Sequence, residues 1–320
     1  MNPERDVSLA PYTSLRVGGS ADFFLHAQSG QDVAEGLRFA RERNLPVRII
    51  GGGSNLLVAE AGVEGLVIRC AHAAHRVEVG EAGPRLVADA GANFANVARR
   101  LAKQGLGGLE WAANVPGTIG GATVNNAGAF GGDTASCLVS ATLVDGDGNA
   151  RQVTSDELGY AYRTSVLKRR EWGDLAVSTV ELRLVQKTPA EADGLVKAFN
   201  GQRMRSQPRI SSAGSVFANP EGTFSGKLIQ EAGLKRMRVG GAEISEQHAN
   251  FIVNPEGATA RDVYTLMRQT QDVVFSQTGI WLRPEIELLG RWTDTERAAL
   301  RGPNDVDPST PDGRQAVAHG

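Results

Sequence analysis

The residue types most able to do chemistry in this chain lie in two glycine-rich segments of its first half. The first, residues 51–55 (Gly-Gly-Gly-Ser-Asn), directly follows the apolar run 47–50. The second covers residues 116–122 and continues into another glycine-rich stretch at 125–132. A strand that runs into a glycine cluster exposes backbone N–H groups, which bind phosphate oxygens. The two segments together therefore predict that each binds a different part of one long ligand. A dinucleotide is the obvious candidate.

Neither segment is one of the common phosphate-binding motifs. The chain contains no Gly-x-x-x-x-Gly-Lys-Ser/Thr, and no Gly-x-Gly-x-x-Gly joins a strand to a helix with an acidic residue about 20 positions further on. Glycines also mark turns and close backbone contacts, and for either segment alone this explanation is equally good. In a chain with 39 glycines, the two segments together favour a ligand cradle.

The bulk composition is that of an ordinary globular enzyme. Of the 320 residues, 41% are apolar and 22% are charged, and a chain of this length typically forms two or three domains. The net charge is −2 and no basic tract occurs, which argues against nucleic acid as a partner. No heptad pattern or large apolar stripe calls for an oligomer, so we expect a monomer.

The sequence reveals no membrane-targeting or metal-binding pattern. No apolar run approaches the ~20 residues of a membrane span, and residues 1–6 lack the basic and then apolar pattern of a signal peptide. Cys70 and Cys137 are too few for a disulfide framework or a zinc site, and Cys70, after an apolar run, is expected to be buried. The five histidines form no metal-ligand spacing. We therefore expect a cytoplasmic protein without metal or membrane contact.

Helices and strands alternate around the two glycine-rich segments, as periodicity and turn residues indicate. The turn at 145–149 predicts that its two flanking strands form a hairpin. The predicted elements of this part are helices at 31–43 and 95–104 and strands at 47–50, 63–70, 85–90, 138–144, 150–153 and 176–185.

A change of pattern at 187–191 predicts a further α+β part. Its expected elements are helices at 192–206, 224–232 and 262–276 and strands at 249–253 and 285–289. A linker near 75–85 divides residues 1–187 into two parts. From about Trp292 the sequence no longer has the pattern of helices and strands. The predicted organisation is two subdomains at 1–78 and 79–187, a third domain at 188–291 and a mobile tail at 292–320.

Three further segments, together with the glycine-rich pair, resemble a known family. They are residues 161–165 (Ala-Tyr-Arg-Thr-Ser), 213–220 (Ala-Gly-Ser-Val-Phe-Ala-Asn-Pro) and 281–286 (Trp-Leu-Arg-Pro-Glu-Ile). In this order the five segments are similar to those of UDP-N-acetylenolpyruvoylglucosamine reductases, the bacterial enzymes that make UDP-N-acetylmuramate for the cell wall. The resemblance covers about residues 12–290. Ala161, where glycine is usual, and Asn114, where a small or apolar residue is usual, depart from the pattern.

The stretch between Val185 and Ser215 is short and carries no extra loop with a tyrosine that could close over substrate. This resembles the second structural type of the family. The fold that the resemblance implies is α+β: a vanillyl-alcohol-oxidase-type (PCMH-type) FAD-binding fold in two subdomains, followed by an α+β substrate-binding domain.

The resemblance also implies a reaction. NADPH reduces a non-covalently bound FAD and leaves, and the enolpyruvyl ether of UDP-N-acetylglucosamine then binds. The flavin passes a hydride to the double bond, and a proton completes UDP-N-acetylmuramate for peptidoglycan synthesis. This chemistry needs a cation beside a carboxylate that gains charge and an acid beside the carbanion carbon.

Three residues on matching segments have the types for these roles. Arg163 has a planar charged fork suited to a carboxylate, and Ser215 has a proton to give. An ionised Glu285 would repel the substrate carboxylate, so it would contribute in protonated form or by orienting Arg163. Taken singly, an ordinary role is favoured for each: a surface charge for Arg163, a turn residue for Ser215 and a solvated carboxylate for Glu285. Their place on three matching segments favours catalysis.

The resemblance further implies which residues contact the ligands. The expected FAD contacts are Gly51, Gly52, Gly53, Ser54, Asn55, Pro116, Gly117, Thr118, Ile119, Gly120, Gly121, Asn126 and Gly128. The candidate substrate contacts are Tyr162, Asn219, Lys227, Gln230 and His248, although Tyr162 could pack and His248 could be a buried, hydrogen-bonded histidine.

Two other functions stay open on the sequence alone. An FAD oxidase of the same superfamily would use O₂ in place of NADPH, although the segments that carry Arg163, Ser215 and Glu285 argue against it. A nucleotide-sugar or dinucleotide binding protein without turnover is the other alternative.

Overall fold

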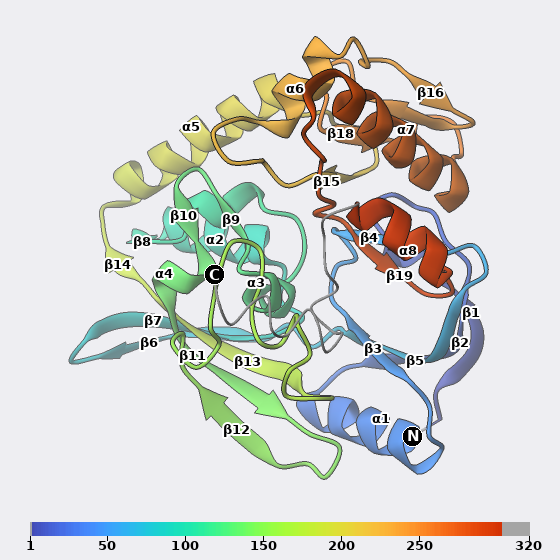
Figure 1. Cartoon of the computed structure of the whole chain (residues 1–320). Helices are drawn as coiled ribbons and strands as arrows, with labels where there is room; N and C mark the ends of the chain where they lie inside the picture. The colour runs from blue at the N-terminus through green and yellow to red at the C-terminus, as the bar shows by residue number, and fades with distance from the viewer. Residues whose placement is uncertain (1, 303–320) are drawn as a thin grey trace. The chain divides into compact units, whose positions relative to one another are not determined.

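The computed structural model, which describes residues 2–302, divides the chain into two units, and each is built from discontinuous segments (Figure 1). The first unit takes the residues up to Val7, Ala21–Gly53 and Glu64–Arg205. The second takes Ser8–Ser20, Ser54–Val63 and the described residues from Ser206. Short segments from the first quarter of the chain therefore belong with its C-terminal part. The three boundaries predicted from the sequence, after residues 78, 187 and 291, stay predictions.

The first unit begins with a four-stranded sheet and one helix. The strand order is β1 (Glu4–Ser8), β2 (Ser20–Ala27), β5 (Val63–Cys70) and β3 (Val47–Ile50). β3 and β5 are parallel. The chain between them, residues 51–62, is long enough to return to the end at which β3 begins, as a parallel pair requires. Helix α1 (Gly30–Glu42) begins at Ser29, whose side chain accepts the Asp32 N–H, and packs Val33 and Leu37 into the core of this sheet.

The same unit contains a five-stranded antiparallel sheet. Its order is β12 (Ala150–Val153), β11 (Leu138–Val144), β13 (Ala176–Arg183), β7 (Gly83–Asp89) and β6 (His75–Gly80). The predicted hairpin at 138–153 is confirmed, with Val144 opposite Ala150. The linker predicted near 75–85 is wrong, because β6 and β7 pair there across a tight turn. β6 lies at the sheet edge and is largely exposed, so its apolar alternation is too weak to recognise.

Helices and short strands complete the first unit. Phe94 and Leu101 of α2 and Ile119 of α3 lie in the core that also holds β7, β11 and β13. The remaining elements are α2 (Phe94–Lys103), β8 (Leu106–Gly107), a 3₁₀ turn (Glu110–Asn114), α3 (Ile119–Asn125), β9 (Gly128–Ala129), β10 (Gly132–Asp133), α4 (Thr134–Cys137), β14 (Val185–Gln186) and α5 (Pro189–Ser206).

The second unit has a four-stranded antiparallel sheet with its own core. The order is β15 (Ser212–Ser215), β18 (Phe251–Val253), β17 (Ala242–Ile244) and β16 (Arg238–Val239). Val263 and Met267 of α7 pack with Ile244 and Ile252. The other elements are a 3₁₀ turn (Ala10–Tyr12), the parallel pair β4 (Leu56–Val58) and β19 (Glu287–Leu289), α6 (Ser225–Glu231), α7 (Ala260–Thr278) and α8 (Asp294–Arg301).

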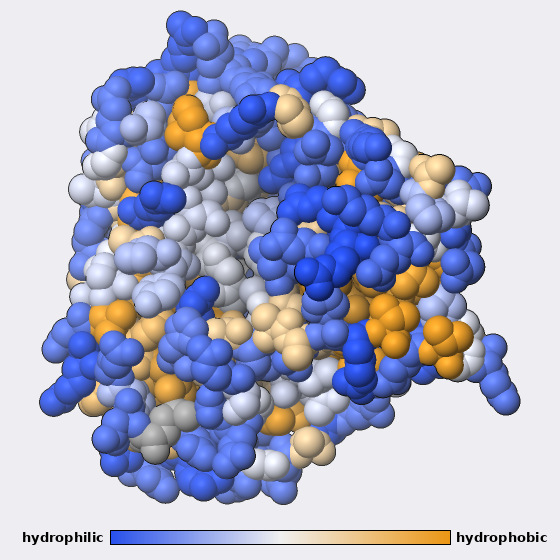
Figure 2. Space-filling view, turned by 180° about the vertical axis from the view of Figure 1, so that it is seen from behind, coloured by the Kyte–Doolittle hydropathy of each residue, from blue (hydrophilic) through white to orange (hydrophobic). Residues whose placement is uncertain are grey.

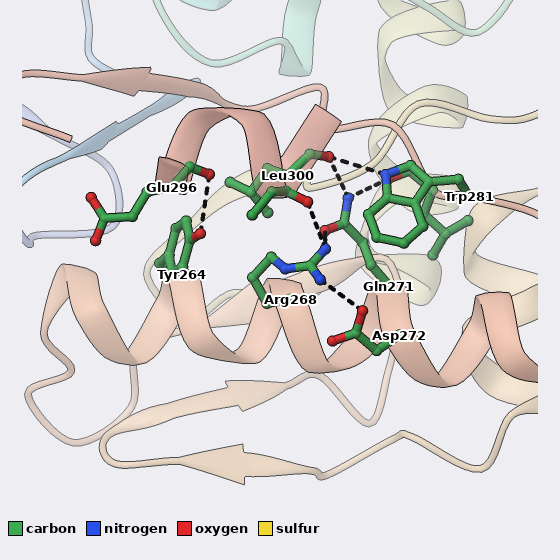
Figure 3. A network of polar contacts seen from close by, with 9 residues as sticks. Tyr264, Arg268, Gln271, Asp272, Trp281, Glu296 and Leu300 are labelled. Carbon is green, nitrogen blue, oxygen red and sulfur yellow. Dashed lines mark hydrogen bonds and ion pairs between the residues drawn. The ribbon is translucent and has the colours of Figure 1, made fainter. Parts of the chain in front are cut away.

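Helix α8 contradicts the mobile tail predicted from residue 292. A capping box of Thr293 and Glu296 starts the helix, and its last carbonyls accept hydrogen bonds from distant side chains (Figure 3). Gln271 Nε2 donates to the Leu300 carbonyl at 2.7 Å, and Trp281 Nε1 donates to the same oxygen at 3.1 Å. These partners are remote in sequence, so the local pattern could not indicate them. Residues 303–320 of the predicted tail lie outside the described residues.

No helix among residues 2–302 is long and apolar enough to cross a membrane. On the face drawn in Figure 2, hydrophilic residues predominate, and hydrophobic residues form small groups among them.

Both cysteines are expected to be unreactive in the folded protein. Burial raises the pKa of Cys70 to about 12, and burial together with the charge of Asp133 raises the pKa of Cys137 to about 12. Since the thiolate is the nucleophile, almost none of it exists at pH 8. A disulfide reagent should therefore label neither thiol in native buffer and both in denaturant. Rapid labelling of either thiol in native buffer would contradict this burial.

Candidate active site

The two glycine-rich segments lie against each other in the first unit. A Cβ atom on Gly52 would lie 2.8 Å from the Gly117 Cα atom, and one on Gly51 would lie 2.2 Å from Thr118 Oγ1. Both distances are shorter than a real Cβ contact, so only glycine permits this approach. Gly53 has φ +59° and Gly117 has φ +105°, which also favour glycine. The segments predicted to grip one ligand are thus neighbours.

The first segment offers backbone donors. Within residues 2–302, the N–H groups of Gly52 and Gly53 donate to no protein acceptor. The second segment differs, because Ile119, Gly120 and Gly121 already donate to the Ala92 carbonyl, the Ala90 carbonyl and Thr118 Oγ1. A ligand could therefore receive hydrogen bonds from residues 52–53, whereas residues 119–121 shape the loop that it would approach.

Two buried polar atoms at the second segment lack a partner among the described residues. They are Asn125 Oδ1 and Asn114 Nδ2. A buried donor or acceptor without a partner is costly, and such atoms commonly await a ligand or water. A flavin dinucleotide carries both donors and acceptors. It can therefore pair with the Asn114 donor, with the Asn125 acceptor and with the N–H groups of Gly52 and Gly53, so these residues fit FAD. No signal in the sequence selects Asn125, and Asn114 stands out there only as a departure from the family pattern.

Arg163 is held beside the second glycine-rich segment. It lies in a tight turn in which Ala161 and Thr164 exchange two backbone hydrogen bonds of 3.3 Å, and its φ of +58° is unusual for a residue with a side chain. Its guanidinium donates from Nη2 to the Gly128 carbonyl at 2.8 Å and from Nη1 to the Asn126 carbonyl at 3.4 Å. These bonds fix the position of the charge, and a strained backbone of this kind is typical of functional sites.

Asn126, predicted as an FAD contact, has its side-chain amide engaged within the protein. Its Nδ2 donates to the Ala161 carbonyl at 3.1 Å, and its Oδ1 accepts the Ala135 N–H at 3.0 Å. The side chain is buried and the backbone has φ +44°. Asn126 thus ties the glycine-rich segment to the turn that carries Arg163.

In the second unit, the segments that carry Ser215 and Glu285 are paired. The Glu285 N–H donates to the Val216 carbonyl at 2.8 Å, and the Ala218 N–H donates to the Arg283 carbonyl at 2.9 Å. Both predicted catalytic side chains are half-buried. Within the described residues the Ser215 hydroxyl has no hydrogen-bond partner, so its proton is available to a ligand.

Asn55, at the end of the first glycine-rich segment, belongs to this same pairing. Its Nδ2 donates to the Glu285 carbonyl at 2.9 Å, and its own carbonyl accepts the Glu287 N–H at 3.0 Å. The side chain predicted to contact FAD therefore also supports the backbone of Glu285.

The five candidate substrate residues occupy varied surroundings. Tyr162 is 58% exposed, with its ring centroid 4.8 Å from Arg163 Cζ. Lys227 and Gln230 are exposed on α6. Asn219 Oδ1 accepts the Ser225 N–H at 3.1 Å. His248 is half-buried, its Nδ1 accepts the Asn250 N–H at 3.2 Å, and burial, with a smaller effect of Lys235, lowers its pKa.

Comparisons with known proteins agree with this organisation. Residues 21–154 match the family model described as "FAD binding domain", and residues 206–289 match "UDP-N-acetylenolpyruvoylglucosamine reductase, C-terminal domain". A UDP-N-acetylenolpyruvoylglucosamine reductase from Synechococcus sp. (strain RCC307) is 41% identical over 302 residues, which cover 93% of this chain and 98% of that protein. One from Gloeobacter violaceus is 42% identical over 288 residues, or 89% of this chain and 95% of that protein.

A solved structure is similar as well. The crystal structure of UDP-N-acetylenolpyruvylglucosamine reductase from Thermus caldophilus matches with a TM-score of 0.76 and 34% identity, and the match covers 90% of this chain and 99% of that one. Together with the FAD-binding match, this confirms the predicted α+β fold class, a vanillyl-alcohol-oxidase-type FAD-binding fold followed by a second α+β part.

Proposed function

The chain belongs to the UDP-N-acetylenolpyruvoylglucosamine reductase family, and we propose that it reduces the enolpyruvyl ether of UDP-N-acetylglucosamine to UDP-N-acetylmuramate. Its bound cofactor is FAD and its hydride donor is NADPH. The observation that supports the proposal is the backbone pairing of Val216, the residue after Ser215, with Glu285.

The residues around the glycine-rich segments would hold FAD without a covalent link. When bound there, FAD would supply hydride transfer from NADPH to the double bond of the substrate. The N–H groups of Gly52 and Gly53 would bind its pyrophosphate, and Asn114 and Asn125 would satisfy polar groups of the flavin. The remaining proposed contacts are Gly51, Ser54, Asn55, Pro116, Gly117, Thr118, Ile119, Gly120, Gly121, Asn126 and Gly128.

The residues of this chain then have distinct tasks. Arg163 places a permanent charge against the substrate carboxylate, which gains charge as the double bond is reduced. Ser215 gives a proton to the carbon next to that carboxylate. Glu285 acts in its protonated form or orients a donor, since an ionised carboxylate would repel the substrate. Tyr162, Asn219, Lys227, Gln230 and His248 are the proposed substrate contacts.

Other features of the proposal concern the type and setting of the enzyme. Between residues 187 and 211 the chain consists of α5 and its short connections, which supports the second structural type of the family. We place the enzyme in the cytoplasm as a monomer that acts on a small molecule.

The direct test is product analysis. Purified protein is incubated with NADPH and UDP-N-acetylglucosamine enolpyruvate, and we expect a product heavier by two hydrogen atoms, formed in step with NADPH oxidation. NADPH oxidation that depends on O₂ and ignores the enolpyruvyl compound would instead indicate an oxidase. A purified protein without flavin absorbance that binds the nucleotide sugar unchanged would indicate a binding protein.

Gly52→Ala is expected to release the flavin. The new Cβ would meet the Gly117 backbone, so one of the two segments must move. We expect flavin affinity to fall about tenfold to a hundredfold, which corresponds to about 1.4–2.8 kcal/mol. Flavin absorbance per protein, measured on dilution, reports this change.

Gly194→Ala is the matched control for Gly52→Ala. Gly194 lies inside α5, where a Cβ would meet nothing within 4 Å, so alanine should stabilise the helix slightly and leave flavin binding unchanged. Equal flavin content in both variants would contradict the proposed cradle.

A further inference from the structure

The side chain of Asn250 pairs with the backbone of the segment that follows Ser215. The Phe217 N–H donates to Asn250 Oδ1 at 3.0 Å, and Asn250 Nδ2 donates to the Phe217 carbonyl at 2.8 Å. Asn250 is 3% exposed and Phe217 is 1% exposed, so water cannot replace these bonds. The amide therefore satisfies both backbone groups of one buried residue, as a neighbouring strand would.

The backbone pairing of β15 with β18 ends just before Phe217, so a side chain has to bind the N–H and C=O groups of Phe217. β15 pairs with β18 as far as Ser215, which lies opposite Phe251, and the next bond runs from the Val216 N–H to the Asn250 carbonyl at 2.9 Å. The register breaks between Ser212 and Ser215, where Gly214 has φ +78°. Beyond Val216, it is the Asn250 side chain that continues the pairing.

The opposite edge of the same segment faces Glu285. Phe217 lies opposite Pro284, and the flanking bonds join Val216 to Glu285 and Ala218 to Arg283. In such a pair the N–H and C=O of the central residue point away from the partner, which suits Pro284 because it has no N–H to offer. The Phe217 groups thus point to Asn250, and residues 216–218 are fixed on both edges.

We propose that Asn250 is a positioning residue that keeps Ser215 in register with Glu285 for proton transfer to the substrate. This proposal rests on the proposed function, in which Ser215 gives the proton. Without the Nδ2 donor, the Phe217 carbonyl would lose its buried partner, and the segment would have to shift to satisfy it. A shift of about 1 Å is enough to slow a reaction by up to about a hundredfold.

Asn250→Asp tests the proposal, because aspartate keeps the shape and the acceptor and loses the donor. The matched control is Asn254→Asp. Asn254 directly follows β18, as Asn250 directly precedes it, and it also uses both amide atoms: Nδ2 donates to the Leu15 carbonyl at 2.8 Å, and Oδ1 accepts the Ala258 N–H at 2.7 Å. Neither of these bonds involves residues 215–218 or 283–285, so only general destabilisation should be common to both variants.

Three rates of the purified flavoprotein separate the outcomes: reduction by NADPH, reoxidation by saturating enolpyruvyl substrate, and reoxidation by O₂. For Asn250→Asp we expect only the second rate to fall, by about tenfold to a hundredfold. For Asn254→Asp we expect all three to stay within about twofold of wild type, since its partners lie elsewhere.

Equal slowing of substrate reoxidation in both variants, or none in Asn250→Asp, would overturn the positioning role. If the Asp variant does not fold, Asn250→Ser is measured in its place, and the same two results would overturn the proposal. A wild-type flavin that the enolpyruvyl substrate fails to reoxidise would instead overturn the proposed function, so the two failures are distinguishable.

Discussion

Ser215→Ala is expected to slow reoxidation of the reduced flavin by the enolpyruvyl substrate about 10²–10⁴-fold, the range that a positioned general acid contributes. Reduction of the same flavin by NADPH should be nearly unchanged, because that step needs no proton from Ser215. The hydroxyl has no partner among residues 2–302, so its removal breaks no hydrogen bond within that part of the protein. Anaerobic stopped-flow absorbance measures the two steps separately.

Ser212→Ala provides the control for this variant. Ser212 lies on the same strand, three residues before Ser215 and opposite Val253. Its replacement by alanine likewise removes one hydroxyl. We expect both of its rates to match wild type. Equal loss of both half-reactions in Ser215→Ala would rule out Ser215 as the proton donor and would indicate damage to flavin binding.

Arg163→Lys is expected to lower kcat/KM for the enolpyruvyl substrate about 10²–10³-fold, as removal of one preorganised charge-stabilising donor does. Lysine keeps the charge but lacks the planar fork that reaches the Gly128 and Asn126 carbonyls while facing a carboxylate. The left-handed φ of +58° strains lysine and arginine alike, so the comparison isolates the head group.

The control for Arg163→Lys is Arg169→Lys. Arg169 follows on the same segment, is exposed and pairs with Glu171 at 2.5 Å, so its replacement should change kcat/KM by less than about twofold. A value for Arg163→Lys within this margin of wild type would remove Arg163 from the chemistry.

The elements that the sequence predicted well are those with strong local signals. Strands 47–50 and 63–70 and the hairpin strands 138–144 and 150–153 match the structure residue for residue. Strands 47–50, 63–70 and 138–144 contain apolar runs, and strand 150–153 is marked by the glycine-containing turn before it, so no remote partner is needed to recognise them. Family resemblance then selected Arg163, Ser215 and Glu285, which periodicity alone would have left as ordinary surface or turn residues.

The features that the sequence did not reveal depend on partners remote in the chain. β6 is an exposed edge strand, and α8 is anchored by Gln271 and Trp281. Asn250 is one of many polar residues until the structure places it against Phe217, 33 residues away. An asparagine side chain that pairs with backbone in place of a strand leaves no periodic signal in the sequence, because its role depends on the geometry of two hydrogen bonds to a remote residue.

The most direct test of the central claim is anaerobic stopped-flow absorbance of the wild-type protein at the flavin band. The protein is mixed first with NADPH and then with UDP-N-acetylglucosamine enolpyruvate. The account predicts that the flavin band bleaches with the first addition and recovers with the second. A band that bleaches and does not recover with the enolpyruvyl compound would contradict the proposed reaction.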